Sequence, residues 1–211
     1  FIESDMKFDP FDLDSLSEVD SEEKAFEWTK ESVKRFVGLG TGRRTVLDWA
    51  EEEETIDMKR IGIIGFSTSA SVAVVTAGID ERIAATVFYS GGVNFHDVLA
   101  EATEPRVRRI RELLKKDRSS WKNFLKKADS LFEPVNPFRY AKRLNPAKTL
   151  FFDAELDEYV PQRVREELWL ASGKPERVTF SSGHRESFLA LTPLGLFSAD
   201  RKIVDFFRKK L

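Results

Sequence analysis

The stretch Lys59-Arg60-Ile61-Gly62-Ile63-Ile64-Gly65-Phe66-Ser67-Thr68-Ser69-Ala70 decides the fold of this chain. Its apolar run, Ile61 to Ile64, is short and rich in β-branched residues, which is typical of a strand covered on both faces. The small, apolar residues from Ser69 to Gly78 are typical of a packed helix. The sequence therefore predicts a buried strand, a sharp turn that carries Ser67, and a helix.

The turn makes Ser67 a candidate nucleophile. A strand and a helix can approach closely only if small residues flank the turn, and Gly65 and Ser69 meet this requirement. Such a turn raises the serine hydroxyl above the edge of the sheet and leaves the backbone N–H of Thr68 free to bind an oxyanion. The alternative is that Ser67 only caps the helix, because serine is a favoured N-cap residue.

Two later loops contain the partners that a serine nucleophile needs. Residues 149–152 predict a strand, and the polar loop after it ends at Pro161, which is suited to starting a helix. Residues 177–180 predict another strand, followed by a loop that ends at His184. An imidazole must accept the serine proton, and a carboxylate must orient that imidazole. Serine, acid and histidine thus each lie just beyond a strand.

The segment Gly65-Phe66-Ser67-Thr68-Ser69 resembles the G-x-S-x-G turn of the α/β-hydrolase superfamily, with serine in place of the last glycine. The order serine, aspartate, histidine is also that of the superfamily. The resemblance is to the dienelactone hydrolase, acetyl esterase and prolyl oligopeptidase branch. It implies an α/β fold with a mostly parallel sheet and helices on both faces. It also implies a triad of Ser67, Asp157 and His184, one oxyanion donor at Thr68, and a substrate-binding residue at Phe66.

Asp157 is chosen as the acid because Ala154-x-x-Asp157-x-x-Val160-Pro161 looks like the acid loop of the superfamily, with Ala154 where glycine is common. Asp153 and Glu155 remain alternative acids, and an aspartate in a loop is often only a solvated turn residue. Of the two histidines, His184 follows a glycine just beyond a strand, an unusual place for core packing. The other, His96, is predicted to be a cap or surface residue.

Composition limits the function classes. With 211 residues and 41% hydrophobic content, the chain fits a single domain over residues 1–211. The net charge of −2 gives no electrostatic case for nucleic acid, and no apolar run is long enough to cross a membrane. The lack of cysteine excludes disulfides, thiolate zinc sites and a cysteine nucleophile, and leaves the compartment open, with the cytoplasm favoured. We expect no metal, no cofactor, and no nucleic-acid or membrane partner.

The region of about 94–145 predicts a helical lid insertion. Its apolar residues recur at helical spacing, as at Val107, Ile110 and Leu114. Insertions at this point of the superfamily commonly cover the active site, and the alternative is an ordinary pair of packed helices. The basic residues from Arg106 to Lys116 are interpreted as a solvated face, since no aromatic-interleaved groove accompanies them.

Three glycines, Gly38, Gly40 and Gly42, are expected to interrupt a helix that Asp20 caps, and a second helix is expected over Arg43–Glu54. The segment Gly38-Leu39-Gly40-Thr41-Gly42 also resembles a dinucleotide-binding loop. We disfavour dinucleotide binding because no strand directly precedes this segment, and a phosphate-binding loop needs a strand before it and a helix after it.

Compared with the usual strand order of the superfamily, this chain contains the later strands and lacks the first few. Phe1-Ile2-Glu3 looks like the tail of a strand, and Asp5 begins the loop after it. The strand that starts at Ile61 is therefore expected to expose one edge. The missing region also normally supplies the second oxyanion N–H. We expect a missing N-terminal segment or a second chain to complete the sheet, unless the first strands are replaced in a fold variant.

The predicted reaction is hydrolysis of small carboxylic esters by Ser67, the commonest chemistry of the superfamily. A serine peptidase of the prolyl oligopeptidase type has the same three loops and is the alternative enzyme. A different class of function is a non-catalytic interaction module that retains the hydrolase scaffold without a working oxyanion hole.

Overall fold

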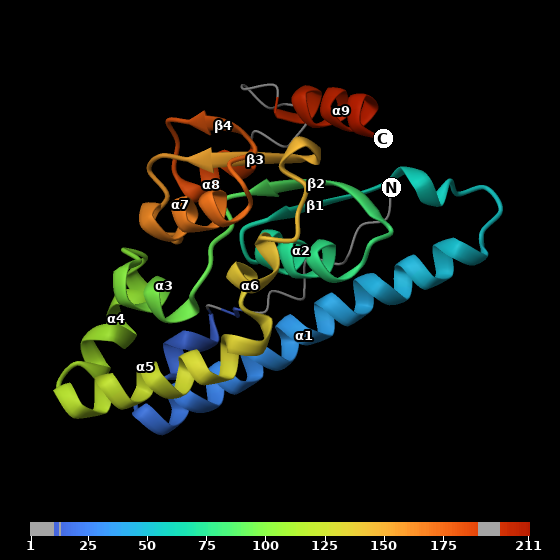
Figure 1. Ribbon diagram of the computed structural model, residues 1–211. Helices are drawn as coiled ribbons and strands as arrows, with labels where there is room; N and C mark the ends of the chain where they lie inside the picture. The colour runs from blue at the N-terminus through green and yellow to red at the C-terminus, as the bar shows by residue number, and fades with distance from the viewer. Residues whose placement is uncertain (1–10, 13, 190–198) are drawn as a thin grey trace.

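The computed structural model describes residues 11–12, 14–189 and 199–211. The strand tail and acidic loop expected at residues 1–5 lie outside these ranges. The described part contains a parallel sheet with the order β1-β2-β3-β4, and α1 (Glu22–Glu52), α4 (Pro105–Leu114) and α5 (Arg118–Phe132) lie to one side of it (Figure 1). Its strands are β1 (Ile61–Phe66), β2 (Ile83–Tyr89), β3 (Thr149–Ala154) and β4 (Glu176–Phe180). The strands predicted from the sequence are confirmed.

The register brings the carboxyl ends of the strands to one edge. Phe66 at the end of β1 is paired with Tyr89, which is in turn paired with Phe152 of β3. The next pair joins Phe152 to Val178 of β4. Since the loops after β1, β3 and β4 leave from the same edge, the three candidate segments of the sequence meet there.

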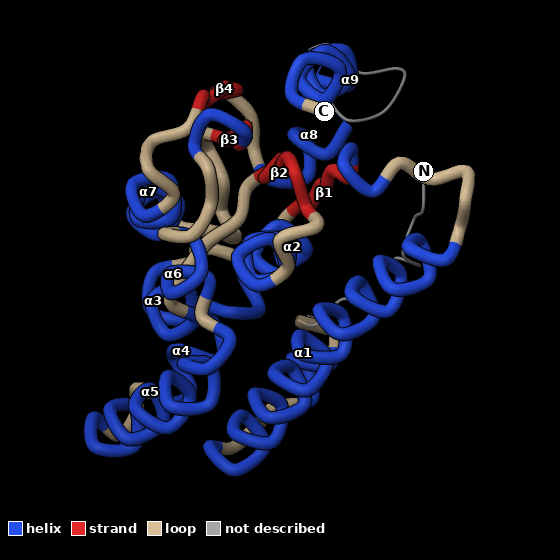
Figure 2. The backbone as a smooth tube through the Cα atoms, turned by 45° about the vertical axis from the view of Figure 1, so that its right-hand side comes forward, coloured by secondary structure: helices blue, strands red, loops and turns tan. Residues whose placement is uncertain are grey.

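Helices cover both faces of the sheet. On one face α2 (Thr68–Ile79), α6 (Pro137–Ala141) and α7 (Gln162–Ala171) pack against inward-facing residues such as Phe88 and Phe151. On the other face α9 (Ala199–Lys210) packs against residues such as Val87. Figure 2 shows α9 and α2 on opposite sides of the strands. The predicted fold class, a parallel sheet with helices on both faces, is confirmed.

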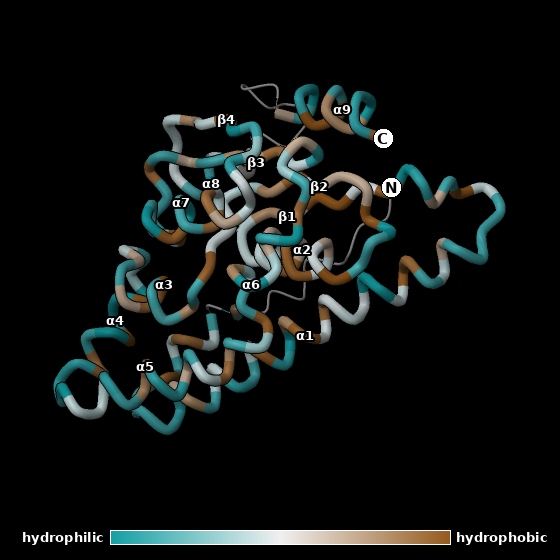
Figure 3. The backbone as a smooth tube through the Cα atoms, viewed as in Figure 1, coloured by the Kyte–Doolittle hydropathy of each residue, from teal (hydrophilic) through white to brown (hydrophobic). Residues whose placement is uncertain are grey.

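The apolar residues of the last helix do not all face the sheet. From its sequence, Ile203, Val204 and Phe206 would be expected to pack there, and Ile203 and Phe206 do, but Val204 is 46% exposed. Neighbouring residues on a helix point about 100° apart, so Val204 cannot share the buried face with Ile203. Figure 3 shows this alternation of hydrophilic and hydrophobic residues along α9.

A single long helix, α1 (Glu22–Glu52), replaces the two helices expected from the glycine string. A Cβ at Gly38 or Gly42 would meet no atom within 4 Å, so these glycines mark no turn and no close contact. Each glycine costs a helix about 1 kcal/mol relative to alanine. Packing of Phe36 on α2 outweighs this cost. The N-cap is Ser21, which accepts the N–H of Lys24, so the prediction of Asp20 as the cap is wrong.

The segment after β2 is helical, as its apolar spacing predicts. It contains α3 (Phe95–Glu101), α4 (Pro105–Leu114) and α5 (Arg118–Phe132), which pack with α1 around a second apolar cluster (Figure 1). Two arginines of the largely exposed basic run also bind backbone carbonyls of other segments. Arg109 donates to the carbonyls of residues 16, 17 and 19, and Arg111 donates to those of residues 99 and 102.

The remaining elements are short. They are α8 (His184–Leu189) and the 3₁₀ turns Ser15–Glu18, Met58–Arg60, Glu133–Val135 and Pro146–Lys148. No helix in the described ranges has the length and apolar character needed to cross a membrane.

The outer edge of β1 pairs with no other strand in the described part of the chain. For this reason the strand is less buried than its composition predicts. Ile63 and Ile64 are only partly buried and Gly62 is exposed, whereas all of β3 is buried. The expectation that β1 exposes an edge is met within the described residues.

Candidate active site

The turn between β1 and α2 holds Ser67 in a strained backbone conformation. Its φ of 54° and ψ of −125° are outside the regions that non-glycine residues prefer. Such strain costs about 1–3 kcal/mol and persists only where the surrounding structure enforces it. The Ser67 N–H donates to the carbonyl of Tyr89 (2.8 Å), and the Ser67 carbonyl accepts the N–H of Ala70 (2.9 Å). The turn is therefore fixed from both sides.

Gly65 makes this turn possible. A Cβ at Gly65 would lie 2.6 Å from the Cα of Ala70 and closer still to the carbonyl oxygen of Ser69. Both contacts are to backbone, which cannot rotate away. Position 69 tolerates serine in place of the usual glycine, because the close approach falls on its carbonyl group and not on its side chain.

The hydroxyl of Ser67 lies 2.9 Å from Nε2 of His184, the first residue of α8. Although Ser67 occupies the N-cap position of α2, its side chain makes no capping hydrogen bond, so the capping alternative is wrong. The imidazole is buried between two aromatic rings, with centroids 5.0 Å from Phe66 and 4.8 Å from Tyr159. These rings restrict its orientation.

Asp157 uses both carboxylate oxygens. Oδ2 lies 2.7 Å from Nδ1 of His184, and Oδ1 accepts the backbone N–H groups of Tyr159 (2.9 Å) and Val160 (2.8 Å). The carboxylate is fully buried. An ionised carboxylate can only accept, so it selects the tautomer with the proton on Nδ1. Nε2 is then free to accept the proton of the Ser67 hydroxyl.

The other candidate residues lie apart from this chain of hydrogen bonds. The carboxylate of Asp153 binds Arg165 and Arg177, and that of Glu155 binds the hydroxyl of Ser181. His96 lies on α3, with Nδ1 2.8 Å from a carboxylate oxygen of Asp129. The structure thus brings together Ser67, His184 and Asp157, whereas Asp153, Glu155 and His96 make contacts elsewhere.

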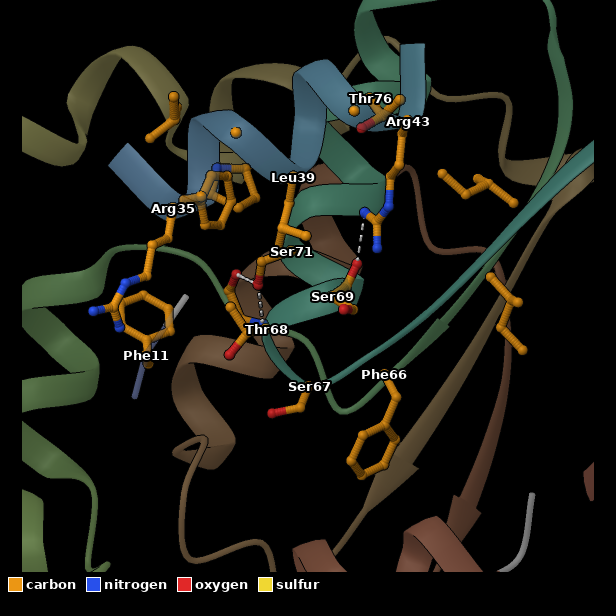
Figure 4. A pocket seen from close by; sticks show the side chains of 18 of the residues that line it. Phe11, Arg35, Leu39, Arg43, Phe66, Ser67, Thr68, Ser69, Ser71 and Thr76 are labelled. Atoms are coloured by element: carbon orange, nitrogen blue, oxygen red, sulfur yellow. Dashed lines mark hydrogen bonds between the residues drawn. The ribbon is translucent and has the colours of Figure 1, made fainter. Parts of the chain in front are cut away.

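The N–H of Thr68, the first residue of α2, has no hydrogen-bond acceptor among the described residues. It points from the positive end of the helix dipole, so it is available to a negatively charged oxygen near Ser67. Thr68 and Phe66 both line a large open cavity of about 2000 Å³ that extends from Ser67 along β1 and the facing side of α1 (Figure 4). Most of its lining residues come from α1, β1, α3 and the loops around His184.

Arg43 of α1 also lines the cavity and was not predicted as a site residue. Its guanidinium donates to the carbonyl of Ser69 (3.2 Å), as Figure 4 shows, and none of the described carboxylates forms an ion pair with it. Loss of water around the group lowers the pKa of Arg43 to about 10. The arginine therefore stays charged at neutral pH and adds positive potential beside the β1–α2 turn.

The described residues contain no group of three or more histidine, aspartate or glutamate side chains arranged to hold a metal ion. Two residues that support the site were missed by sequence reasoning. The ring of Tyr159 packs against His184 in a tilted geometry, and Arg165 binds the loop that carries Asp157. An aromatic residue next to the predicted acid was a signal for Tyr159. An arginine on an amphipathic helix gave no such signal.

No protein-family model and no curated protein sequence matches this chain. Solved structures do. The acylaminoacyl peptidase of Pyrococcus horikoshii is 18% identical with a TM-score of 0.61, over 79% of this chain and 26% of that chain. An acetyl xylan esterase from Paenibacillus sp. R4 is 18% identical with a TM-score of 0.60, over 79% and 50%. A 2,6-dihydroxy-pseudo-oxynicotine hydrolase is 17% identical with a TM-score of 0.59, over 82% and 46%.

The chain spans between about a quarter and a half of the length of these three proteins. At such low identity the likeness concerns the fold. The chain has the α/β-hydrolase fold, as its turn sequence and the order of its three loops predict.

Proposed function

We propose that this protein is a serine hydrolase that cleaves carboxylic esters through an acyl-enzyme on Ser67. The observation that carries the proposal is the continuous chain of hydrogen bonds from a strained serine to a buried imidazole and a buried carboxylate. A serine that only caps a helix needs neither partner, and a structural histidine does not require a serine hydroxyl 2.9 Å away. Strain and buried polar groups that converge at one point are typical of catalytic sites.

In the first half of the reaction, the Ser67 oxygen attacks the ester carbonyl while Nε2 of His184 accepts the hydroxyl proton. The carbonyl oxygen becomes an oxyanion, and the N–H of Thr68 is placed to bind it. The bond to the alcohol then breaks, and His184 returns the proton to the leaving oxygen. Asp157 stabilises the positive imidazolium during both proton transfers.

In the second half, a water molecule attacks the acyl group on Ser67. His184 accepts a proton from this water, and the tetrahedral intermediate collapses to release the carboxylic acid and to restore the serine hydroxyl. All proton transfers pass through Nε2, so the tautomer that Asp157 selects serves both halves. The residues that carry out these steps are on the described part of the chain.

An ester is the proposed substrate because ester hydrolysis makes the smaller demand on the oxyanion hole and the leaving group. A peptidase is the second candidate, since the matching structures include a peptidase as well as esterases. We also propose that α3, α4 and α5, which contribute residues to the cavity, act as the lid over Ser67. A further strand, from an additional segment or a second chain, would complete the open edge of β1.

The test compares three substrates: p-nitrophenyl acetate, p-nitrophenyl butyrate and a proline p-nitroanilide peptide. We expect both esters to be hydrolysed at least tenfold faster than the anilide, and we expect the Ser67→Ala variant to lose all three activities. A faster rate on the anilide would replace the esterase with the peptidase. No turnover of any substrate by the folded, monodisperse protein would favour the non-catalytic interaction module.

A further inference from the structure

A buried ion pair joins the two ends of the loop that carries Asp157. Asp153 lies near the end of β3, before the loop, and Arg165 lies in the first turn of α7, after it. Nε of Arg165 lies 2.5 Å from Oδ1 of Asp153. The two side chains are 1% and 4% exposed. The loop of residues 155–161 is thus closed at its base by two opposite charges that water does not reach.

Arg165 also contacts the loop itself. Its Nη1 donates to the backbone carbonyl of Val160, and the N–H of Val160 donates to Oδ1 of Asp157 at 2.8 Å. A continuous path of hydrogen bonds therefore runs from Asp153 through Arg165 and the backbone of Val160 to Asp157, and from there to His184.

Stability alone does not explain a charged pair at this position. The loss of water around two buried charges offsets much of their attraction, and well-packed apolar residues of similar size are often equally stable. A guanidinium, however, donates in fixed directions from a rigid plane, so it can hold two acceptors in a defined geometry. Here the two acceptors are a carboxylate of the strand and a carbonyl of the loop.

The charged side chains around Arg165 pair with one another and not with Ser67, His184 or Asp157. The second oxygen of Asp153 binds Arg177, whose guanidinium also binds Glu166 at 2.5 Å. Each of the four charged side chains therefore has an opposite partner, and Arg165 is the member of this network that contacts the acid loop. Its role can be tested apart from that of Arg177.

We propose that Arg165 is a positioning residue for the hydrolytic site: paired with Asp153, it holds the backbone of Val160 through its carbonyl and thereby the N–H of the same residue that orients Asp157 against His184. The proposal rests on the proposed function of Ser67, His184 and Asp157. It adds a residue that touches neither substrate nor the reacting atoms.

The test replaces Arg165 by Met and by Lys and measures kcat and KM for p-nitrophenyl butyrate. A displacement of about 1 Å at the site costs about 10²-fold in rate, so we expect kcat of Arg165→Met to fall by about that factor with KM unchanged. Lysine retains a positive charge that can pair with Asp153, but it lacks the second donor group that binds the Val160 carbonyl. We therefore expect Arg165→Lys to recover only part of the lost kcat. Arg208→Met on α9 is the matched control, because that side chain is 78% exposed and its ion pair is with Asp205 on the same helix. It should retain the parental kcat.

A second measurement does not depend on activity. The proton on Nδ1 of His184, shared with Asp157, gives a separate resonance far downfield in the proton NMR spectrum. We expect this resonance in the parent and in Arg208→Met, and we expect it to broaden or move upfield in Arg165→Met. If the parent fails to hydrolyse any ester, the proposed function fails while this resonance still reports on the positioning.

A parental kcat together with a parental His184 resonance in Arg165→Met would overturn the proposal. If that single variant does not fold, the double variant Asp153→Leu/Arg165→Met removes both charges together, which buried pairs usually tolerate. The double variant should then show the same loss of kcat and the same change in the resonance. An unchanged resonance in the folded double variant would overturn the proposal as well.

Discussion

Replacing Gly65 by alanine tests whether the close contact of β1 with α2 sets the position of Ser67. The added Cβ would lie 2.6 Å from the Cα of Ala70 and even nearer to the carbonyl oxygen of Ser69. Both atoms belong to the backbone of the turn, so relief requires β1 and α2 to move apart. Because Ser67 lies between them, its hydroxyl must move relative to His184.

The size of the effect follows from the contact. Forcing one extra carbon into a tightly packed place costs about 1–3 kcal/mol. For a chain of this size, each kcal/mol lowers the melting temperature by about 2–4 °C, so we expect a loss of about 2–12 °C. A shift of the hydroxyl by about 1 Å would lower kcat by about 10²-fold, because attack requires a near-ideal geometry. The Gly65→Ala variant should therefore remain folded at room temperature while its kcat falls by about 10²-fold.

The assay combines thermal unfolding with hydrolysis of p-nitrophenyl butyrate. Gly38→Ala is the matched control, since a Cβ there meets nothing within 4 Å and the site lies on an exposed turn of α1. This control should gain about 1 kcal/mol of stability with unchanged kcat. A Gly65→Ala variant that is as stable and as active as the parent would refute our account of the turn.

Three further predictions concern the site and the pH dependence of stability. Ser67→Gly should be about 1 kcal/mol more stable than Ser67→Ala in thermal unfolding, because glycine accepts a φ of 54° without strain; equal stabilities would contradict the assigned strain. Asp157→Asn should lower kcat by about 10⁴-fold through the wrong tautomer of His184, and a loss below tenfold in steady-state assays would contradict this role. Arg82 and Arg44 lower the pKa of Asp80 to about 2, so the stabilisation of about 2 kcal/mol is complete above pH 4 and is lost as the pH falls toward 2. Acid unfolding of Asp80→Asn should lack this component, and identical pH profiles would contradict the assignment.

Much of the fold follows from local patterns. The run from Ile61 to Ile64 and the small residues after Ser67 are consistent with one strand-turn-helix unit, and the structure has that unit within a residue or two of the predicted ends. The three candidate residues could be predicted because each follows a strand, and parallel strands end at one edge. Here local sequence and topology agree, so short segments of sequence were sufficient to predict the turn and the three candidate residues.

The glycines of α1 show where local reasoning fails. Three glycines in five positions favour a break in an isolated helix, but tertiary packing of Phe36 on α2 decides the outcome. The basic run of α4 is a different case. It is mostly exposed, as the sequence predicts, but Arg109 and Arg111 also donate to carbonyls of other segments, and these contacts were not predicted. Contacts between distant segments leave no periodic signal.

Arg165 is the clearest case of a residue that the sequence could not reveal. A charged residue on an amphipathic helix is usually exposed, and only the path of the chain brings this one beneath the acid loop. The choice of Asp157 over Asp153 and Glu155 rested on the likeness of its loop to the acid loop of the superfamily, since all three carboxylates lie close together in the sequence. In the structure Asp153 binds two arginines, whereas Asp157 faces His184.

The central claim is that His184 activates Ser67 for attack, and labelling with a fluorophosphonate probe tests it most directly. The probe should modify the folded parent at a single residue, Ser67, as identified by mass spectrometry of the digested protein. Labelling should be absent in Ser67→Ala and strongly reduced in His184→Ala, because an unactivated hydroxyl reacts too slowly. A folded parent that resists the probe, or that is labelled equally without His184, would contradict the account.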